Sequence, residues 1–104
     1  MKLYYNTRSL NDKLFLHYKG FRDIENLEDF TGLKVLYIEG NAISEIKGLT
    51  FCTELRCLYL HENCIREMSG LDTLDKLDTL NLGDNFIDAI QGLENCKKLT
   101  SLLI

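Results

Sequence analysis

A group of apolar residues recurs along this chain at a constant interval of 22 residues. Residues 55–65 read L-x-x-L-x-L-x-x-N-x-I, and the same string begins 22 residues earlier at Leu33 and 22 residues later at Leu77. It begins once more at Leu99, close to the last residue. A fixed period of this length is typical of solenoids, in which each repeat forms one coil and neighbouring coils bury each other's apolar side chains. The period therefore predicts a stack of coils.

Within each repeat, two spacings predict what the coil looks like. Leu58 and Leu60 alternate with more polar residues, which is the period of a strand with one buried face. Ile43, Ile46 and Leu49 are three residues apart, which favours a 3₁₀-like or short helical return over a regular α-helix. We therefore predict an α/β fold: a leucine-rich-repeat solenoid with a short parallel β-sheet on its concave face and 3₁₀ or short helical returns on its convex face.

The repeat boundaries divide the chain without a linker. At 104 residues and with no proline, it is expected to form a single leucine-rich-repeat domain over 1–104. The expected parts are an N-terminal cap at 1–12, a degenerate repeat at 13–32, full repeats at 33–54, 55–76 and 77–98, and the start of a truncated repeat at 99–104. Ending inside a strand would expose Leu102, Ile104 and an unpaired sheet edge. We expect either a fragment of a longer protein or self-association of two copies through that edge.

Composition and charge exclude several classes of function. The net charge of −4 argues against a nucleic-acid or anionic-membrane partner, and no apolar run is long enough to cross a bilayer. The first residues lack the apolar segment of a secretory signal, so reduced thiols are favoured over a disulfide framework. Cys52 and Cys96 fall at the repeat position of Leu74 and are interpreted as small buried residues. No cofactor is expected.

Three asparagines occupy one repeat position directly after the strands. They are Asn41, Asn63 and Asn85. Their side-chain amides can bond the backbone of the turn and of the adjoining coil, so they are predicted to form a structural ladder.

The residues that alternate with the buried leucines define the outward surface of the sheet. The 22-residue register aligns Phe15, Tyr37 and Tyr59 on successive strands and predicts an aromatic ladder. Aromatic residues are favoured at protein interfaces, so this ladder is the leading candidate for partner binding. The alternative is that stacked rings only stabilise neighbouring strands.

A second outward column contains His17, Glu39 and His61, with the carboxylate between the two imidazoles, and these residues are further candidates for partner binding on the concave face. Adjacent strands are ~4.8 Å apart, so the histidines would be separated by twice that distance. Because a metal needs both imidazole nitrogens near ~2 Å, no metal site is predicted, and a mutually hydrogen-bonded polar patch is favoured.

Lys34 and Arg56 sit immediately before two strands, whereas Asp78 takes the same place in the next repeat. This asymmetry could orient an acidic partner segment, although ordinary solvated charge explains it equally well.

No nucleophile, base and orienting group can be named together, and no phosphate-binding glycine loop or metalloprotease motif occurs. The chain is therefore predicted not to be an enzyme.

Two stretches carry a resemblance to known families. The short repeat is similar to that of the protein-phosphatase regulatory leucine-rich-repeat proteins. The string L-N-D-K-L-x-L-H-x-K-G-F at 10–21 resembles the opening of the axonemal dynein assembly factor 1 family, and residues 54–60 and 76–82 resemble its next repeats.

This resemblance implies a protein scaffold of the cytoplasm and of the cilium or flagellum. Its partners would be dynein chains, chaperones or assembly co-factors, and it would support pre-assembly of dynein arms. The alternatives are a phosphatase regulator and a structural subunit bound to axonemal dynein.

Overall fold

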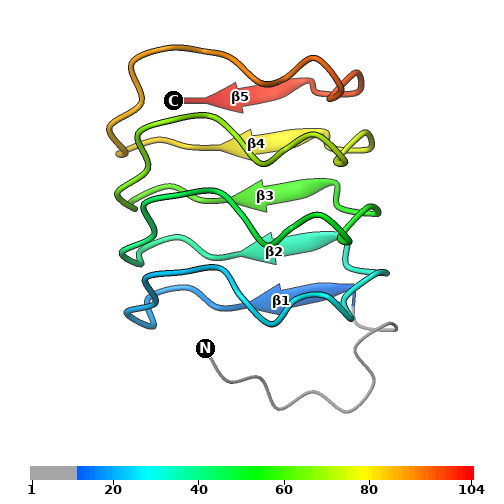
Figure 1. The fold of residues 1–104 in the computed structure, drawn as a ribbon, viewed down its shortest axis with the longest axis horizontal. Helices are drawn as coiled ribbons and strands as arrows, with labels where there is room; N and C mark the ends of the chain where they lie inside the picture. Colours follow the sequence, from blue (N-terminus) through cyan, green and yellow to red (C-terminus); the bar gives the residue numbers. More distant parts are fainter. Residues whose placement is uncertain (1–11) are drawn as a thin grey trace.

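Five short parallel strands form one sheet whose order follows the sequence. The computed structural model describes residues 12–104, so the predicted cap lies outside the described residues except for Asp12. The sheet has the order β1-β2-β3-β4-β5, and each strand comes from a separate coil of the stack (Figure 1). The strands are β1 (Lys13–Phe15), β2 (Val35–Tyr37), β3 (Cys57–Tyr59), β4 (Thr79–Asn81) and β5 (Ser101–Leu103).

The register of the sheet equals the period of the sequence. Leu14 pairs with Leu36, Leu36 with Leu58, Leu58 with Leu80, and Leu80 with Leu102. The first four of these leucines are fully buried, so they form a continuous column inside the stack. Removing one such side chain from water contributes about 1.5–3 kcal/mol. The predicted leucine-rich-repeat solenoid is confirmed.

The returns differ from the helical segments that the three-residue spacing suggested. No helix is present among residues 12–104, and in that part of the chain no helix could therefore span a membrane. The Cys52 amide donates to the Leu49 carbonyl at 3.0 Å, and the Leu55 amide donates to the Cys52 carbonyl at 3.1 Å. These bonds occur only at every third residue, whereas a 3₁₀-helix bonds consecutive residues. Each return is thus a series of separate turns, and the helical detail of the expected α/β fold was wrong.

The asparagine side chains form hydrogen bonds with backbone groups of their own turn and of the previous coil. Asn63 donates through Nδ2 to the carbonyls of Leu60 in its own coil, at 3.0 Å, and Ile38 in the previous coil, at 3.2 Å. Its Oδ1 accepts from the amide of Ile43 at 3.0 Å. Asn41 and Asn85 make the corresponding bonds. The amide of Asn63 is buried, and its bonds join two coils as well as closing one turn.

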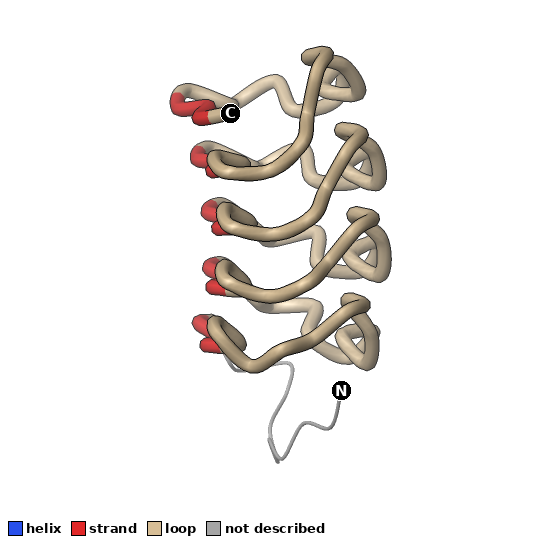
Figure 2. Tube along the Cα trace, turned by 90° about the vertical axis from the view of Figure 1, so that its left-hand side faces the viewer, coloured by secondary structure: helices blue, strands red, loops and turns tan. Residues whose placement is uncertain are grey.

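Each coil leaves its strand through a residue in the left-handed conformation. The φ angles are 51° at Tyr18, 70° at Gly40, 56° at Glu62 and 55° at Asp84, one residue in each of four coils. At Gly40, a Cβ atom would lie 2.1 Å from the ring of Tyr18, so glycine leaves room for that ring. Figure 2 shows that these turns bring all five strands onto one side of the stack and the returns onto the other.

Candidate functional site: the outward face of the sheet

The aromatic residues of the first three strands stack along the solenoid axis. We call the outward side of β1–β5 the sheet face; it is the surface expected to be concave. The ring centroids of Phe15 and Tyr37 are 4.8 Å apart at an angle of 8°, and those of Tyr37 and Tyr59 are 4.9 Å apart at 12°. These distances match the spacing of neighbouring strands. Phe15 is 50% exposed, and both tyrosines are half-buried. The rings therefore form one ladder that faces out of the core.

The column next to the ladder is aligned as predicted but is not mutually bonded. His17 Nδ1, Glu39 Oε1 and His61 Nδ1 are covered and have no hydrogen-bond partner among the described residues. The imidazoles instead lie edge-on to neighbouring rings, His17 at 6.3 Å from Phe15 and His61 at 6.4 Å from Tyr59. The expected hydrogen-bonded patch was therefore wrong: each imidazole lies edge-on to a ring of its own coil, and no hydrogen bond joins the three side chains among the described residues.

Tyr18 lies beyond the ends of the strands and was not singled out from the sequence. Its hydroxyl donates to Glu62 Oε2 at 2.5 Å, which links the first described coil with the third. This bond and the negative charge of Glu62 raise the pKa of Tyr18 above its ordinary value. The ring is 62% exposed, so Tyr18 adds an aromatic surface at this end of the sheet face. The repeat register aligns Tyr18 with Gly40, but the left-handed turn that lays the Tyr18 ring against Gly40 is seen only in the structure.

The opposite edge of the sheet face, where the strands begin, carries more cations than the sequence indicated. Besides Lys34 and Arg56, it includes Lys76 and Lys98, which were missed because they precede their strands by three residues rather than one. Lys76 pairs with Glu54 at 2.6 Å, and this pairing lowers the pKa of the Glu54 carboxyl. A hollow of about 460 Å³ is lined by Arg56, Lys76, Asp78 and Lys98.

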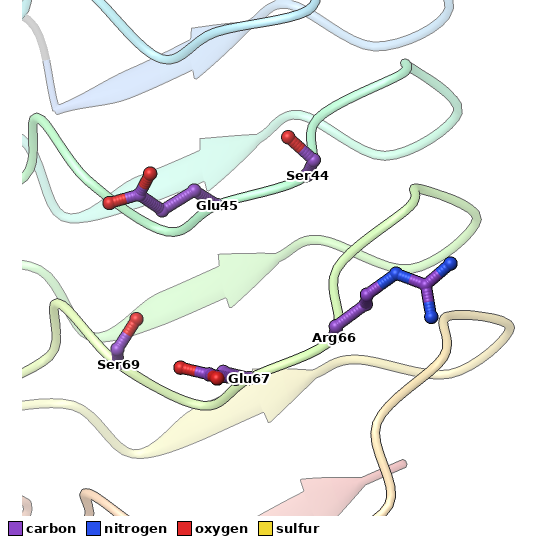
Figure 3. A pocket seen from close by; sticks show the side chains of 5 residues that line it. All are labelled: Ser44, Glu45, Arg66, Glu67 and Ser69. Atoms are coloured by element: carbon purple, nitrogen blue, oxygen red, sulfur yellow. The ribbon is translucent and has the colours of Figure 1, made fainter.

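The returns carry a separate polar hollow on another surface of the molecule. It measures about 280 Å³, and Figure 3 shows its five lining side chains on two successive coils. They are Ser44, Glu45, Arg66, Glu67 and Ser69. The guanidinium of Arg66 lies 5.5 Å from the ring of Phe86. The polar groups here belong to the side of the stack opposite the sheet, so they do not join the aromatic ladder in one site.

The chemistry of the described residues favours recognition by surface contact. No group of three or more His, Cys, Asp or Glu side chains within residues 12–104 is arranged to hold a metal ion. Burial raises the pKa of the Cys52 thiol to about 11, which makes it a poor nucleophile at neutral pH. The sheet face instead presents stacked rings and separated charges, which suit a protein partner.

The class of protein is defined by three features together: the repeat register, the strand order and the open sheet face. The family described as Leucine Rich repeats (2 copies) matches residues 31–76 and 53–95, and the chain belongs to this leucine-rich-repeat family.

Named relatives indicate a narrower group than the leucine-rich-repeat family as a whole. A stretch of 41 residues is 63% identical to the dynein axonemal assembly factor 1 homolog of Drosophila erecta, and 39 residues are 54% identical to the leucine-rich repeat-containing protein ODA7 of Chlamydomonas reinhardtii. The predicted similarity to axonemal dynein assembly factor 1 proteins is confirmed. These matches cover 39% and 38% of this chain but only 3% and 9% of the respective relatives.

Solved structures give the same fold over a longer stretch. The internalin inlF of Listeria monocytogenes superimposes with a TM-score of 0.85 at 31% identity, covering 92% of this chain and 28% of that one. The internalin inlC2 of the same bacterium gives 0.78 at 27% identity, covering 86% of this chain and 40% of that one. Fold, family and relatives together support a protein-interaction scaffold.

Proposed function

We propose that this chain is a non-enzymatic scaffold that binds proteins through its sheet face and supports the pre-assembly of axonemal dynein arms. The observation that carries the dynein assignment is the 41-residue stretch that is 63% identical to a dynein axonemal assembly factor 1 homolog. One fold can serve many functions, so the leucine-rich repeat alone does not specify the partner. The matched stretch is also only a small share of each relative. The partners would be dynein chains, chaperones or assembly co-factors. The place of action would be the cytoplasm, in support of the cilium or flagellum.

The aromatic ladder supports the sheet face as the binding surface. Stacked rings that are partly exposed offer apolar area to a partner while losing little side-chain freedom on binding. Phe15, Tyr37 and Tyr59 already hold each other in place in the described chain. The same stacking also stabilises neighbouring strands, so binding and stability must be measured separately.

A pull-down from extracts of ciliated cells tests this proposal. The bait is the full-length protein that contains this chain, either unchanged or with Tyr37→Ser and Tyr59→Ser. We expect the unchanged bait to capture dynein heavy chains together with chaperones, and the double variant to lose at least nine-tenths of them. The matched control is Phe51→Ser with Phe86→Ser, because these rings are 58% and 60% exposed but lie outside the sheet strands.

The outcomes distinguish the proposed function from its alternatives. Capture of a phosphatase catalytic subunit without dynein would favour a phosphatase regulator. Recovery of the protein with dynein from extracted axonemes would favour a structural subunit. Full capture by the folded Tyr37→Ser, Tyr59→Ser variant would exclude the aromatic ladder as the binding surface.

Self-association at the edge of β5 is a separate proposal. Leu103 is 50% exposed and Ile104 is 54% exposed beside the outer edge of β5. An open edge strand can pair with another chain. Light scattering after size-exclusion chromatography should then show a dimer that Leu103→Lys converts to a monomer; a monomer at all concentrations would exclude this pairing.

A further inference from the structure

The sheet face has opposite charges at its two long edges, one where the strands begin and one where they end. The first edge carries four cations together with the carboxylates of Asp12, Glu54 and Asp78, so that cations are in excess. The second edge carries three carboxylates and one cation, Lys19. The four cations of the first edge are Lys34, Arg56, Lys76 and Lys98, and the three carboxylates of the second edge are Glu39, Glu62 and Asp84. The aromatic ladder lies between the two edges.

Most of the cations at the strand-start edge are available to a partner. Lys76 is neutralised by Glu54. Among residues 12–104, Lys34, Arg56 and Lys98 take part in no ion pair. The nearby carboxylate of Asp78 accepts a hydrogen bond from the Thr100 hydroxyl. Within residues 12–104, the hollow of about 460 Å³ therefore has two cations without an ion pair in its lining, Arg56 and Lys98, beside the carboxylate of Asp78.

The strand-end edge is acidic over three successive coils. Glu39 is half-buried, with Oε1 covered and without a hydrogen-bond partner in the described chain, whereas Glu62 and Asp84 are exposed. The hydroxyl of Tyr18 donates to Glu62 Oε2 at 2.5 Å, which holds the Glu62 side chain in place. The other titratable side chains at the strand-end side of the sheet face are His17, His61 and Tyr18, and Lys19 follows β1 by four residues.

The stacking of the ladder determines which part of each ring a partner meets. Because the planes of neighbouring rings are within 12° of parallel, the faces of Tyr37 cover those of its neighbours. A partner lying on the sheet face therefore meets ring edges, which carry partial positive charge, and offers them apolar groups or oxygen acceptors.

We propose that the partner segment of the sheet face carries separated charges: it crosses the aromatic ladder with acidic residues over the strand-start edge and basic residues over the strand-end edge. Apolar residues between the two charged blocks contact Phe15, Tyr37 and Tyr59. This inference rests on the proposed function and adds the chemistry and orientation of the segment that is bound. Complementary charges at two edges specify orientation and exclude segments of the opposite order.

Binding of short synthetic peptides, followed by fluorescence anisotropy, tests the charge order. One peptide has an acidic block, a central apolar block and a basic block. A second has the same composition with its charges mixed, and a third replaces every charged residue with Gln. We expect the block peptide to bind at least tenfold more tightly than either other peptide, and to weaken as salt is added. Equal binding of the block and mixed peptides, or no binding of the block peptide, would overturn the proposal.

Charge reversal in the protein provides the sharper measurement. Lys34→Glu with Arg56→Glu, or Glu62→Lys with Asp84→Lys, should each lower the affinity for the block peptide about tenfold, since each places like charges together. Combining all four substitutions keeps the net charge of the protein. It should restore binding, because both edges are then reversed and the block peptide can bind in the opposite orientation. The matched control is Lys47→Glu with Lys97→Glu, which changes two cations in the returns and should leave affinity unchanged.

A paramagnetic label on the acidic end of the peptide reports the orientation. It should broaden the amide signals of residues before the strands in the unchanged protein and of residues after the strands in the fourfold variant. Broadening in the same place in both proteins would overturn the assignment. Circular dichroism of every variant separates lost binding from lost folding. Because the peptide assay does not involve dynein, its failure would leave the pull-down result, and hence the proposed function, standing.

Discussion

The third and fourth described coils have nearly the same pattern but different burial. In the coil at 55–76, the apolar side chains from Leu55 to Leu74 at the repeat positions are at most 1% exposed. In the coil at 77–98, Leu80 and Leu82 are equally buried beneath β5, whereas Ile90 in the return is 61% exposed. The difference shows that a repeat position becomes core only where another coil covers it, because one coil cannot bury its own return.

The largest contrast is expected for apolar truncations. Leu58→Ala should lower the free energy of unfolding by about 2–5 kcal/mol, because it leaves a cavity in the buried column. Ile90→Ala should cost less than about 1 kcal/mol, because its side chain already faces water. Urea unfolding followed by circular dichroism measures both; equal losses would mean that burial by the neighbouring coil does not decide the cost.

A glycine that contacts the previous coil should be less replaceable than one that does not. A Cβ atom at Gly70 would lie 2.1 Å from the carbonyl oxygen of Ile46, whereas one at Gly20 would meet nothing within 4 Å. Both residues have positive φ angles, so alanine at either costs about 1–2 kcal/mol. Gly70→Ala should cost about 1–3 kcal/mol more because backbone must move. Equal thermal midpoints of the two variants would contradict the close contact between coils.

The asparagine ladder should show the same dependence on burial. Asn63→Ala should lower the free energy of unfolding by about 1–3 kcal/mol, because it leaves the Ile43 amide and the Ile38 carbonyl without this partner. Asn85→Ala removes the same kinds of bond at a half-buried site, where water can replace part of them, and should cost less. A thermal midpoint of Asn63→Ala equal to that of the unchanged protein would exclude a stabilising ladder.

The smallest effect concerns the ion pair that joins two coils at the strand-start edge. Lys76 holds the pKa of Glu54 below its ordinary value, so the pair stabilises the fold above that value, and its contribution is lost as pH falls through the lowered pKa. Lys76→Met should raise the pKa of Glu54 in an NMR titration, and Lys98→Met should leave it unchanged. An unaltered Glu54 titration in Lys76→Met would show that the pair does not form in solution.

The candidate site was predictable where it depended on register alone. Phe15, Tyr37 and Tyr59 share one repeat position, and a constant period places such residues on neighbouring strands. The orientation of His17 and His61 was not predictable, because the repeat register gives the column of a residue but not the rotamer that sets each imidazole edge-on to a neighbouring ring. Tyr18 was missed because its role depends on the turn after β1, and Lys98 was missed because it lies three residues before its strand.

For this protein, the sequence by itself determined the coil, the register and the identity of the buried column, because apolar residues at a constant period have one common way to be buried. It also carried the likeness to dynein assembly factors. Only the tertiary structure decided that the returns are separate turns and that Ile90 is exposed where Met68 is buried. Those properties depend on the neighbour that each coil meets, and a repeat pattern within one coil does not specify that neighbour.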